Sequence, residues 1–411
     1  MKVAIAGYGV EGRASLSYWR ARGHDVTVAD ERDRLDDIPD GTPTILGAGA
    51  FGWLDEFDMV VRTASLRPDR IQTQGRVWSA TNEFFEQCCA PIIGVTGTKG
   101  KGTTCSLIAS ILRAAGRTVH VVGNIGQPAL AEIDDIQPDD IVVYELSSFQ
   151  LWDLERSPHI AVVLPIERDH LDVHADMHEY VEAKANIARH QTADDVIVYH
   201  AGNDYTRRIA AYSPATTRIE YPFAIDQFEA SLQLPGRHNV ENAAAAIAAT
   251  REYVSDDDAI KRGLAACEGL PHRLKFVAEV DGVRYYDDSI STTPGSAIAA
   301  LNSFDQPKIL ILGGSDKGAD YTAIVERCVA TRTTIIAIGQ TGETISAIGE
   351  RRGALCHRVD GRMDQVVAEA KQLAQSGDVV ILSPASASFD QYKNYADRGE
   401  QFIAAVKALA G

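Results

Sequence analysis

Short apolar runs alternate with amphipathic stretches from the start of the chain. The runs at 3–6 and 25–29 predict buried strands, and the stretch from about 13 to 22 predicts a helix between them. Glycines at positions 7, 9 and 12 separate the first strand from this helix, and Asp30 ends the second strand. This order is typical of a βαβ unit that binds a dinucleotide, and a glycine-permitted turn without a ligand is the alternative interpretation.

The same alternation continues along the rest of the chain. It predicts parallel sheets that are covered by helices on both faces. Asp281-Gly282 lies between two further strands and indicates a hairpin. The expected elements are strands at 58–62, 92–95, 119–122, 141–144, 160–164, 196–199, 276–280, 283–286, 309–312, 334–338 and 379–382, an Ala-rich helix at about 243–250, and a last helix at about 398–409.

These elements fall into three α/β units, at residues 1–89, 90–271 and 272–411. The joints lie near Cys89 and at the sequence Gly269-Leu270-Pro271. The first unit is too short for a full six-stranded NAD-binding fold. This length therefore argues against an NAD-dependent dehydrogenase.

Composition narrows the class of protein. The 411 residues are 45% hydrophobic and 24% charged, as in soluble globular proteins, which excludes a disordered chain, a collagen and a coiled coil. With 40 Lys+Arg and 57 Asp+Glu, the net charge of −17 argues against binding to nucleic acid or to an anionic membrane. Six cysteines without a CxxC pair, no leader segment and no apolar run of membrane-spanning length predict a cytoplasmic protein with free thiols.

The glycine-rich loop at 96–104 follows the strand at 92–95 and precedes a helix in which apolar residues recur at helical spacing. Backbone N–H groups of such a loop converge on phosphate oxygens at a helix N-terminus. Lys101 can reach the β- and γ-phosphates of a nucleotide, and Thr103 can supply a hydroxyl to Mg²⁺. The strict Walker A pattern fails, because Val95 replaces its first glycine and Gly102 follows the lysine. An unliganded turn is the alternative. The expected phosphate-binding residues are Gly97, Thr98, Lys99, Gly100, Lys101, Gly102, Thr103 and Thr104.

Polar residues follow two later strands. Glu145 ends the apolar run at 141–144, so its carboxylate points to the edge where parallel sheets bind ligands. Carboxylate oxygens are ligands that Mg²⁺ accepts, which makes Glu145 a candidate for the metal, with an ordinary solvated strand end as the alternative. His170 is a candidate ligand of a second metal, and Lys184 lies on the helix that follows. Either residue could instead be structural or solvated.

Nine sequence runs carry a resemblance that covers essentially the whole chain. They resemble the Mur ligases of peptidoglycan synthesis, which are relatives of folylpolyglutamate synthase, and they are most similar to the branch that adds glutamate to UDP-N-acetylmuramoyl-L-alanine. The runs are TGTKGKGTT (96–104), VVGNIGQPAL (121–130), ELSSFQL (145–151), RDHLD (168–172), LPGRHNVENA (234–243), GLPHRL (269–274), DDSISTTPGS (287–296), LGGSDKGADY (312–321) and LSPASASFDQYKNYADRG (382–399).

The resemblance implies a three-domain α/β fold: a small Rossmann-like UDP-binding domain, a central P-loop ATPase domain with a parallel sheet, and a C-terminal Rossmann-like domain that carries the amino acid. It implies ATP-dependent formation of an amide through an acyl phosphate. Two Mg²⁺ ions would take part, and the enzyme would act as a monomer.

Individual roles follow from the matched motifs. Lys101, Glu145, His170 and Lys184 would be catalytic, and Thr103, Glu145, His170 and a carbamylated Lys184 would hold the metals. Asn239, Asn242, Arg273 and Asp288 would bind the nucleotide. The residues expected at the UDP substrate and at glutamate are Val10, Glu11, Asp30, Glu31, Arg32, Asn124, Thr292, Lys317, Ser388, Phe389 and Tyr395.

The sequence also departs from the family pattern. Lys99 and Gly102 change the phosphate loop, and Ile290 replaces a lysine near the glutamate site. The turn at 63–66 and Pro165 differ as well, so the uridine contacts and the choice between D- and L-glutamate stay open.

Two alternatives accompany the ligase hypothesis: another amino acid or acceptor, as in folylpolyglutamate synthase, and a non-catalytic nucleotide-binding module. Lys101→Ala and Glu145→Ala are expected to abolish turnover with little loss of stability, because both side chains are expected in an open cleft.

Overall fold

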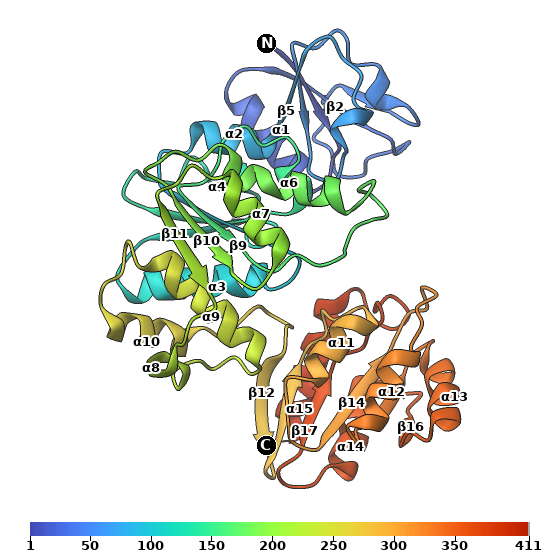
Figure 1. Cartoon of the computed structure of the whole chain (residues 1–411). Coiled ribbons are helices and arrows are strands. Elements are labelled where there is room, and N and C mark those ends of the chain that lie inside the picture. The colour runs from blue at the N-terminus through green and yellow to red at the C-terminus, as the bar shows by residue number, and fades with distance from the viewer. Residues whose placement is uncertain (410–411) are drawn as a thin grey trace. The chain divides into compact units, whose positions relative to one another are not determined.

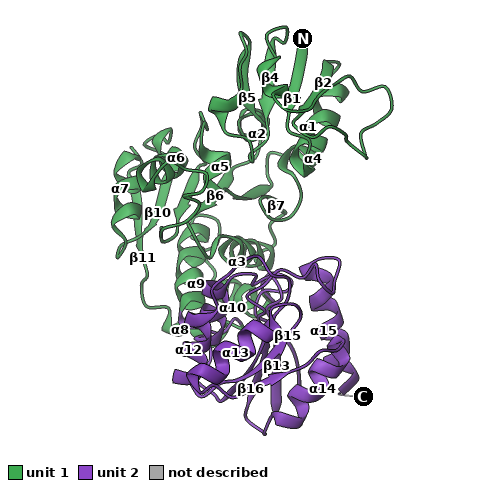
Figure 2. Ribbon diagram, turned by 90° about the vertical axis from the view of Figure 1, so that its right-hand side faces the viewer, with its two compact units in different colours: residues 1–233, 238–267 green, residues 234–237, 268–411 purple. Residues whose placement is uncertain are grey.

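Three separate β-sheets organise residues 1–409, which the computed structural model describes (Figure 1). The chain divides into two units, shown in different colours in Figure 2. Unit 1 comprises Met1–Gln233 and His238–Cys267 and contains two of the sheets. Unit 2 comprises Leu234–Arg237 and the chain from Glu268 onward and contains the third.

The first sheet of unit 1 has five parallel strands in the order β3-β2-β1-β4-β5. The order reverses between β1 and β4, and ligands of open α/β sheets bind beyond the carboxyl ends of the strands at such a point. The five strands of this sheet are fewer than the six of a full NAD-binding fold, as the short first segment predicted. Its elements are β1 (Lys2–Ala6), α1 (Val10–Ala21), β2 (Asp25–Asp30), β3 (Thr44–Leu46), β4 (Met59–Arg62), β5 (Arg76–Ser79) and α2 (Ala80–Gln87).

The second sheet of unit 1 has six parallel strands in the order β11-β10-β9-β6-β8-β7. Its strands β6 and β8 are almost wholly apolar and buried, as sheets covered on both faces require. The strands are β6 (Ile92–Thr96), β7 (Val119–Gly123), β8 (Ile141–Glu145), β9 (Ile160–Val163), β10 (Val196–His200) and β11 (Thr217–Tyr221). The helices are α3 (Lys101–Ala114), α4 (Ala129–Glu132), α5 (Ser148–Leu151), α6 (Met177–Arg189), α7 (Asp204–Tyr212), α8 (Asp226–Glu229), α9 (Arg237–Thr250) and α10 (Asp257–Ala266).

Unit 2 is built on a mixed sheet in the order β12-β13-β17-β14-β15-β16, in which β12 runs antiparallel to β13. The hairpin at Asp281-Gly282 is confirmed, with φ of 53° and 78° at the two turn residues. Two apolar clusters cover the two faces of the sheet. The elements are β12 (Lys275–Val280), β13 (Val283–Asp287), α11 (Pro294–Leu301), β14 (Lys308–Gly313), α12 (Thr322–Ala330), β15 (Thr334–Ile338), α13 (Gly342–Arg352), β16 (Cys356–Arg358), α14 (Met363–Leu373), β17 (Val379–Leu382) and α15 (Tyr395–Leu409).

The strands that were not expected share one position in their sheets. The strands β3, β5, β11 and β16 lie at sheet edges, where one side is exposed, and they carry no apolar run that would predict them. Helices α1 and α15 begin three residues earlier than expected, and α10 lies in a segment for which no helix was expected. The boundaries at 89/90 and 271/272 stay predictions.

All six cysteines are free thiols, as their spacing predicted. Across residues 1–409, no helix combines the length and the apolar character that a membrane crossing needs.

Candidate active site

The glycine-rich loop joins β6 to α3, as the sequence predicted. Gly97 and Gly100 have φ of 152° and 83°, a conformation that side chains rarely adopt. A Cβ atom on Gly97 would lie 2.6 Å from Cβ of Leu164, and one on Gly100 would lie 2.6 Å from Oδ1 of Asn242. The loop is therefore packed against the end of β9 and against α9. Asn242 also donates a hydrogen bond to Asn239 (3.2 Å). These two of the four residues predicted to bind the nucleotide therefore lie beside the loop.

Lys101 begins α3 and folds back over the loop. Its Nζ atom donates to the carbonyl oxygens of Gly97 (3.1 Å) and Thr98 (3.0 Å). The ammonium group thus lies where phosphate oxygens would meet the N-terminus of α3. Thr103 and Thr104 are buried in the first turns of the helix, and the hydroxyl of Thr104 has no hydrogen-bond partner in the described part of the chain. Lys99 points elsewhere, to an exposed ion pair with Glu167 (2.9 Å).

Glu145 is the last residue of β8, which is paired with β6, so its carboxylate lies beside the phosphate loop. Only 4% of the residue is exposed, and the expectation of an open cleft around Glu145 is wrong. Asn124, which follows β7, donates from Nδ2 to Oε1 of Glu145 (3.2 Å). The other carboxylate oxygen, Oε2, is buried without a partner among residues 1–409. A buried, unpartnered carboxylate oxygen fits a cation or a donor supplied by a ligand.

Lys184 on α6 is also fully buried. Its Nζ atom donates to the carbonyl oxygen of Gly97 (3.0 Å) and lies 3.3 Å from Oγ1 of Thr96. Burial lowers the pKa of Lys184 well below its usual value, and the nearby charge of Lys101 lowers it further. Asp169 and Glu145 act in the opposite direction. The amine therefore loses its proton far more readily than an exposed lysine.

His170 lies at the exposed end of the loop after β9. Its φ of 52° is unusual for a residue with a side chain, and its ring lies 5.0 Å from the ring of Phe149. The nearest acidic partner is Asp169, with 3.5 Å between His170 Nε2 and Oδ2. Within residues 1–409, no three His, Cys, Asp or Glu side chains form a group that could hold a metal ion. A metal here would need Thr hydroxyls, Glu145 and ligand oxygens, which is the donor set that Mg²⁺ prefers.

Two further residues line this region that the sequence pattern did not indicate. Tyr180 shares a hydrogen bond with Oγ1 of Thr98 (3.1 Å), and burial raises its pKa to about 12. His174 is buried against Ser148, with 2.9 Å between Nε2 and Oγ, and burial lowers its pKa. The available signal for Tyr180 was its spacing, because it precedes Lys184 by four residues on one helix and so shares its face.

Most of the predicted UDP-site residues lie at or after the carboxyl ends of β1 and β2. Glu11 accepts a hydrogen bond from the N–H of Ala64 (2.6 Å), and burial raises its pKa. Asp30 accepts from the N–H of Tyr8 (2.8 Å) and from Arg32, whose hydrogen bond lowers the pKa of Asp30 to about 2. Val10 is 68% exposed, and Glu31 forms an ion pair with Arg70 (2.5 Å). Asn124 is the exception, since it lies beside Glu145.

In unit 2, the predicted glutamate-site residues come from the loops that follow β13, β14 and β17. Thr292, Lys317 and Tyr395 are exposed and Ser388 is buried. Lys317 Nζ lies 5.7 Å from the ring centre of the exposed Phe389.

Arg398, which the sequence pattern did not indicate, is hydrogen-bonded to the backbone of two of these loops. It is fully buried and donates to the carbonyl oxygens of Ser289 (2.8 Å), Ser386 (3.1 Å) and Ala387 (3.2 Å).

Asp288 also belongs to unit 2, beside the exposed Arg273. It is 3% exposed and accepts from Ser383 Oγ (2.6 Å) and from the N–H of Leu274 (3.1 Å). Burial raises the pKa of Asp288 to about 6, against a smaller opposing effect of Arg273.

Replacing Asp288 with asparagine is expected to stabilise unit 2 at neutral pH. The folded state holds the proton of Asp288 more tightly than the unfolded chain, whose reference pKa is 3.8. Stability is therefore lost as the pH rises from about 4 to about 6, and the charged form costs about 1–3 kcal/mol above that range. Asparagine keeps an acceptor for Leu274 without the charge. Thermal unfolding followed from acid to neutral pH should show the advantage of the variant only near neutrality, and an equal advantage at both ends would contradict the assignment.

Comparison with known proteins places this arrangement in a family. The UDP-N-acetylmuramoylalanine--D-glutamate ligase of Symbiobacterium thermophilum is 37% identical over 100% of this chain and 98% of its own length. The chain belongs to the Mur ligase family. The corresponding ligase of Acetivibrio thermocellus is also 37% identical and covers 99% of the chain and 96% of its own length. Two family models agree: the Mur ligase middle domain matches residues 95–224, and the Mur ligase glutamate ligase domain matches 272–386.

Solved structures show the same fold at low sequence identity. The UDP-N-acetylmuramate-alanine ligase of Thermotoga maritima has a TM-score of 0.61 and 16% identity, with 99% of both chains covered. The folylpolyglutamate synthase of Mycobacterium tuberculosis, solved with ADP, has a TM-score of 0.60 and 16% identity, covering 81% of this chain and 93% of its own. The three-domain Mur ligase fold expected from the sequence is confirmed. As a Mur ligase, the chain is an ATP-dependent enzyme that forms amide bonds.

Proposed function

We propose that this Mur ligase joins glutamate to UDP-N-acetylmuramoyl-L-alanine, with ATP converted to ADP and phosphate. The observation that carries the proposal is the similarity to ligases of that name over the full length of the chain. The candidate site supports it, because it brings Lys101, Glu145 and Lys184 around one phosphate loop. The product would be a peptidoglycan precursor, and the enzyme would act in the cytoplasm as a monomer.

The first step of the proposed reaction brings two anions together. The substrate carboxylate attacks the γ-phosphate of ATP, and an acyl phosphate forms as ADP leaves. Lys101 would hold the β- and γ-phosphates, and the N–H groups at the start of α3 would neutralise further charge. Asn239 and Asn242 would contact the nucleoside. Arg273 and Asp288, the other residues expected to bind the nucleotide, belong to unit 2. In the second step the amine of the amino acid attacks the acyl carbon, and phosphate is released.

Magnesium would be held at two positions. Thr103 and Glu145 would bind the first ion, and His170 with a carbamylated Lys184 would bind the second. The fit is supported by the unpartnered Oε2 atom of Glu145. When bound, Mg²⁺ supplies positive charge that stabilises the oxygens of the transferred phosphoryl group. Asn124, which bonds Glu145, would orient that carboxylate and meet the muramoyl-alanine part of the substrate.

We propose that Lys184 is carbamylated. CO₂ reacts with the unprotonated amine, and burial, which lowers the pKa of Lys184, favours that form. A fall in pH protonates the amine and releases CO₂, so activity should fall with it. Protein incubated with isotopically labelled bicarbonate should give one carbamate signal in carbon NMR, absent from Lys184→Arg. A wild-type spectrum without the signal would contradict carbamylation and would leave the ligase assignment standing.

The amino acid would be bound in unit 2 by Thr292, Lys317, Ser388, Phe389 and Tyr395. The named relatives use D-glutamate, and we propose D-glutamate here. Ile290 places an apolar side chain where a lysine is expected, so the amino-acid pocket carries less positive charge. A second candidate is another amino acid or acceptor, which the folylpolyglutamate-like ending of the phosphate loop favours.

Phosphate release tests the proposal directly. Purified protein is mixed with ATP, Mg²⁺ and UDP-N-acetylmuramoyl-L-alanine, and D-glutamate, L-glutamate and other amino acids are added in parallel. Release is expected only when the UDP substrate and glutamate are both present. Release that needs neither compound would exclude the proposed function, whereas release with a folate acceptor would establish the second candidate.

A further inference from the structure

Arg62 is the largest side chain in unit 1 that is wholly buried. It ends β4, and its guanidinium group reaches the segment that follows α5 in the second sheet. There Nε and Nη2 donate to the two carboxylate oxygens of Asp153 (2.7 and 2.5 Å), and Nη2 also donates to the carbonyl oxygen of Phe149 (2.9 Å). Nη1 donates to the carbonyl oxygens of Thr63 (3.3 Å) and Leu66 (3.1 Å). The planar group thus fixes two distant segments to each other.

The turn at 63–66 that Arg62 holds lies at the crevice where an open sheet of this strand order is expected to bind its ligand. It follows β4, and the strand order of the sheet reverses between β1 and β4, where such sheets bind ligands. Thr63 lies against the glycine loop after β1, since a Cβ on Gly7 would lie 2.3 Å from Oγ1 of Thr63. The N–H of Ala64 is held by Glu11 (2.6 Å). A shift of the turn would therefore change the shape of the crevice.

The guanidinium group also bonds the segment of the chain that follows Glu145. Phe149 and Asp153 follow Glu145 by four and eight residues in the chain, and Phe149 lies against His170. Arg62 accordingly joins the crevice of the first sheet to the segment that carries the candidate catalytic carboxylate. Its five N–H groups are all occupied by these bonds, so no other side chain can reproduce the arrangement.

We propose that Arg62 is a positioning residue for the UDP-linked substrate: through Asp153 it sets the turn at 63–66 relative to Glu145. The inference rests on the proposed function, because the UDP moiety is placed in the crevice at β1 and β4. Loss of the guanidinium bridge would let the turn move and would weaken binding of the UDP substrate. The ATP site, built on β6, α3 and α9, would keep its shape.

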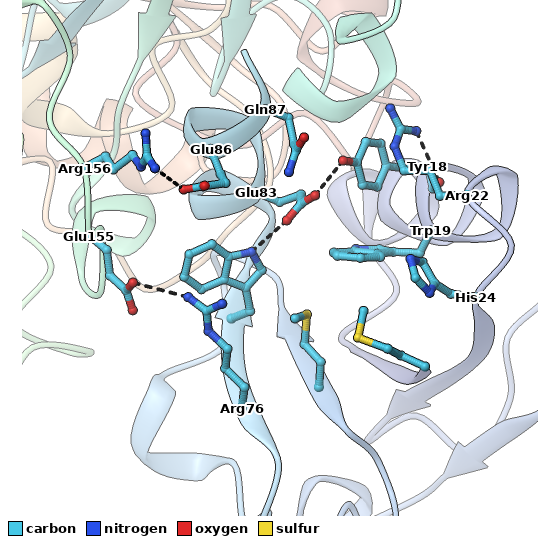
Figure 3. A pocket seen from close by; sticks show the side chains of 13 residues that line it. Tyr18, Trp19, Arg22, His24, Arg76, Glu83, Glu86, Gln87, Glu155 and Arg156 are labelled. Atoms are coloured by element: carbon cyan, nitrogen blue, oxygen red, sulfur yellow. Dashed lines mark hydrogen bonds and ion pairs between the residues drawn. The ribbon is translucent and has the colours of Figure 1, made fainter. Parts of the chain in front are cut away.

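Two other ion pairs join the same parts of unit 1 without touching the turn. Arg156 pairs with Glu86 (2.6 Å) and Arg76 pairs with Glu155 (3.4 Å), as Figure 3 shows. They border a pocket of about 550 Å³ at the amino-terminal ends of β1, β4 and β5, opposite the crevice. Arg156→Ala therefore removes a connection between the two sheets while it leaves the turn in place, and it is the matched control.

The experiment compares wild type, Arg62→Lys, Asp153→Asn and Arg156→Ala in steady-state phosphate release. KM for the UDP substrate is expected to rise about tenfold in Arg62→Lys and by less in Asp153→Asn, while KM for ATP stays within about twofold. Arg156→Ala should leave both values unchanged. Lysine keeps the positive charge but lacks the planar guanidinium group. We therefore expect the charge alone to be insufficient for normal binding of the UDP substrate. Partial unfolding lowers the maximal rate and leaves KM unaffected, so a variant that folds poorly still gives an answer.

The outcomes separate the two proposals. If wild type releases no phosphate with the UDP substrate and glutamate, the proposed function fails. If wild type is active and both KM values of Arg62→Lys match wild type, the inference about Arg62 is wrong. It is also wrong if Arg156→Ala raises KM for the UDP substrate as much as Arg62→Lys does, because a general loosening of the two sheets would then explain the effect.

Discussion

Replacing Lys101 with methionine should lower kcat/KM for ATP by about three orders of magnitude. The ammonium group folds over the phosphate loop and donates to the carbonyl oxygens of Gly97 and Thr98 (3.1 and 3.0 Å). With ATP bound it would meet the charge that develops on the transferred phosphoryl group. Methionine keeps the length and apolar volume of the side chain, and the loop conformation is set by Gly97 and Gly100. The measurement is phosphate release at varied ATP, with circular dichroism to establish folding.

Lys261→Met is the control for the removal of a lysine charge. Lys261 lies on α10 and pairs with Asp258 at the surface (3.6 Å). Its loss should leave the rate unchanged. If Lys101→Met retained more than about a tenth of the wild-type rate, the phosphate-binding role of Lys101 would be wrong.

Glu145→Gln should lower kcat by about two to three orders of magnitude without lowering the melting temperature. The carboxylate is 4% exposed, and its Oε2 atom has no partner in the described residues, so the folded protein without ligands gains little from the charge. Glutamine keeps an oxygen for Asn124 and removes the negative charge that would bind Mg²⁺. Rates are measured at several Mg²⁺ concentrations, and an Mg²⁺ dependence equal to that of wild type would contradict the metal role.

Glu83→Gln is the matched comparison for a buried carboxylate. Both oxygens of Glu83 are bonded. One accepts from the hydroxyl of Tyr18 (2.6 Å; Figure 3) and the other from Nε1 of Trp78 (2.9 Å). An amide can accept only one of these bonds, so the variant should lose about 1–3 kcal/mol of stability and keep its rate per folded molecule. The two variants together separate a carboxylate that serves the fold from one that serves a ligand.

The phosphate loop could be predicted from sequence because its signal is local. Glycines, a lysine and hydroxyl residues stand between an apolar strand and an amphipathic helix, and the structure has that order at β6, the loop and α3. The same holds for Glu145, which ends a strand whose four preceding residues are buried. What this local pattern could not give was the burial of Glu145. The carboxylate is bonded by Asn124, a residue that follows β7 and lies 21 positions earlier in the chain.

Contacts between residues far apart in the chain escaped the sequence pattern. Arg62 and Asp153 are separated by 91 positions, and Ser289 and Arg398 by 109, so neither pairing has a periodic or spacing signal. Arg62 reads in the sequence as the polar end of a strand, the position where a solvated arginine is expected. The short edge strands were not predicted for a different reason. Residues at an exposed sheet edge do not need to be apolar, so these strands carry no apolar run.

The bridge between Arg62 and Asp153 also constrains how this chain can change over generations. A substitution at Asp153 leaves the wholly buried charge of Arg62 without its partner, which costs more than the pair contributes. A substitution at Arg62 leaves Asp153, whose side chain is 26% exposed, without its cation. We therefore expect substitutions at the two positions to occur nearly together during evolution. The alternative is an earlier substitution that lets water reach the site. Among descendants of a common ancestor, the two positions should be exchanged as a couple, and lineages that lack the arginine should lack the aspartate as well.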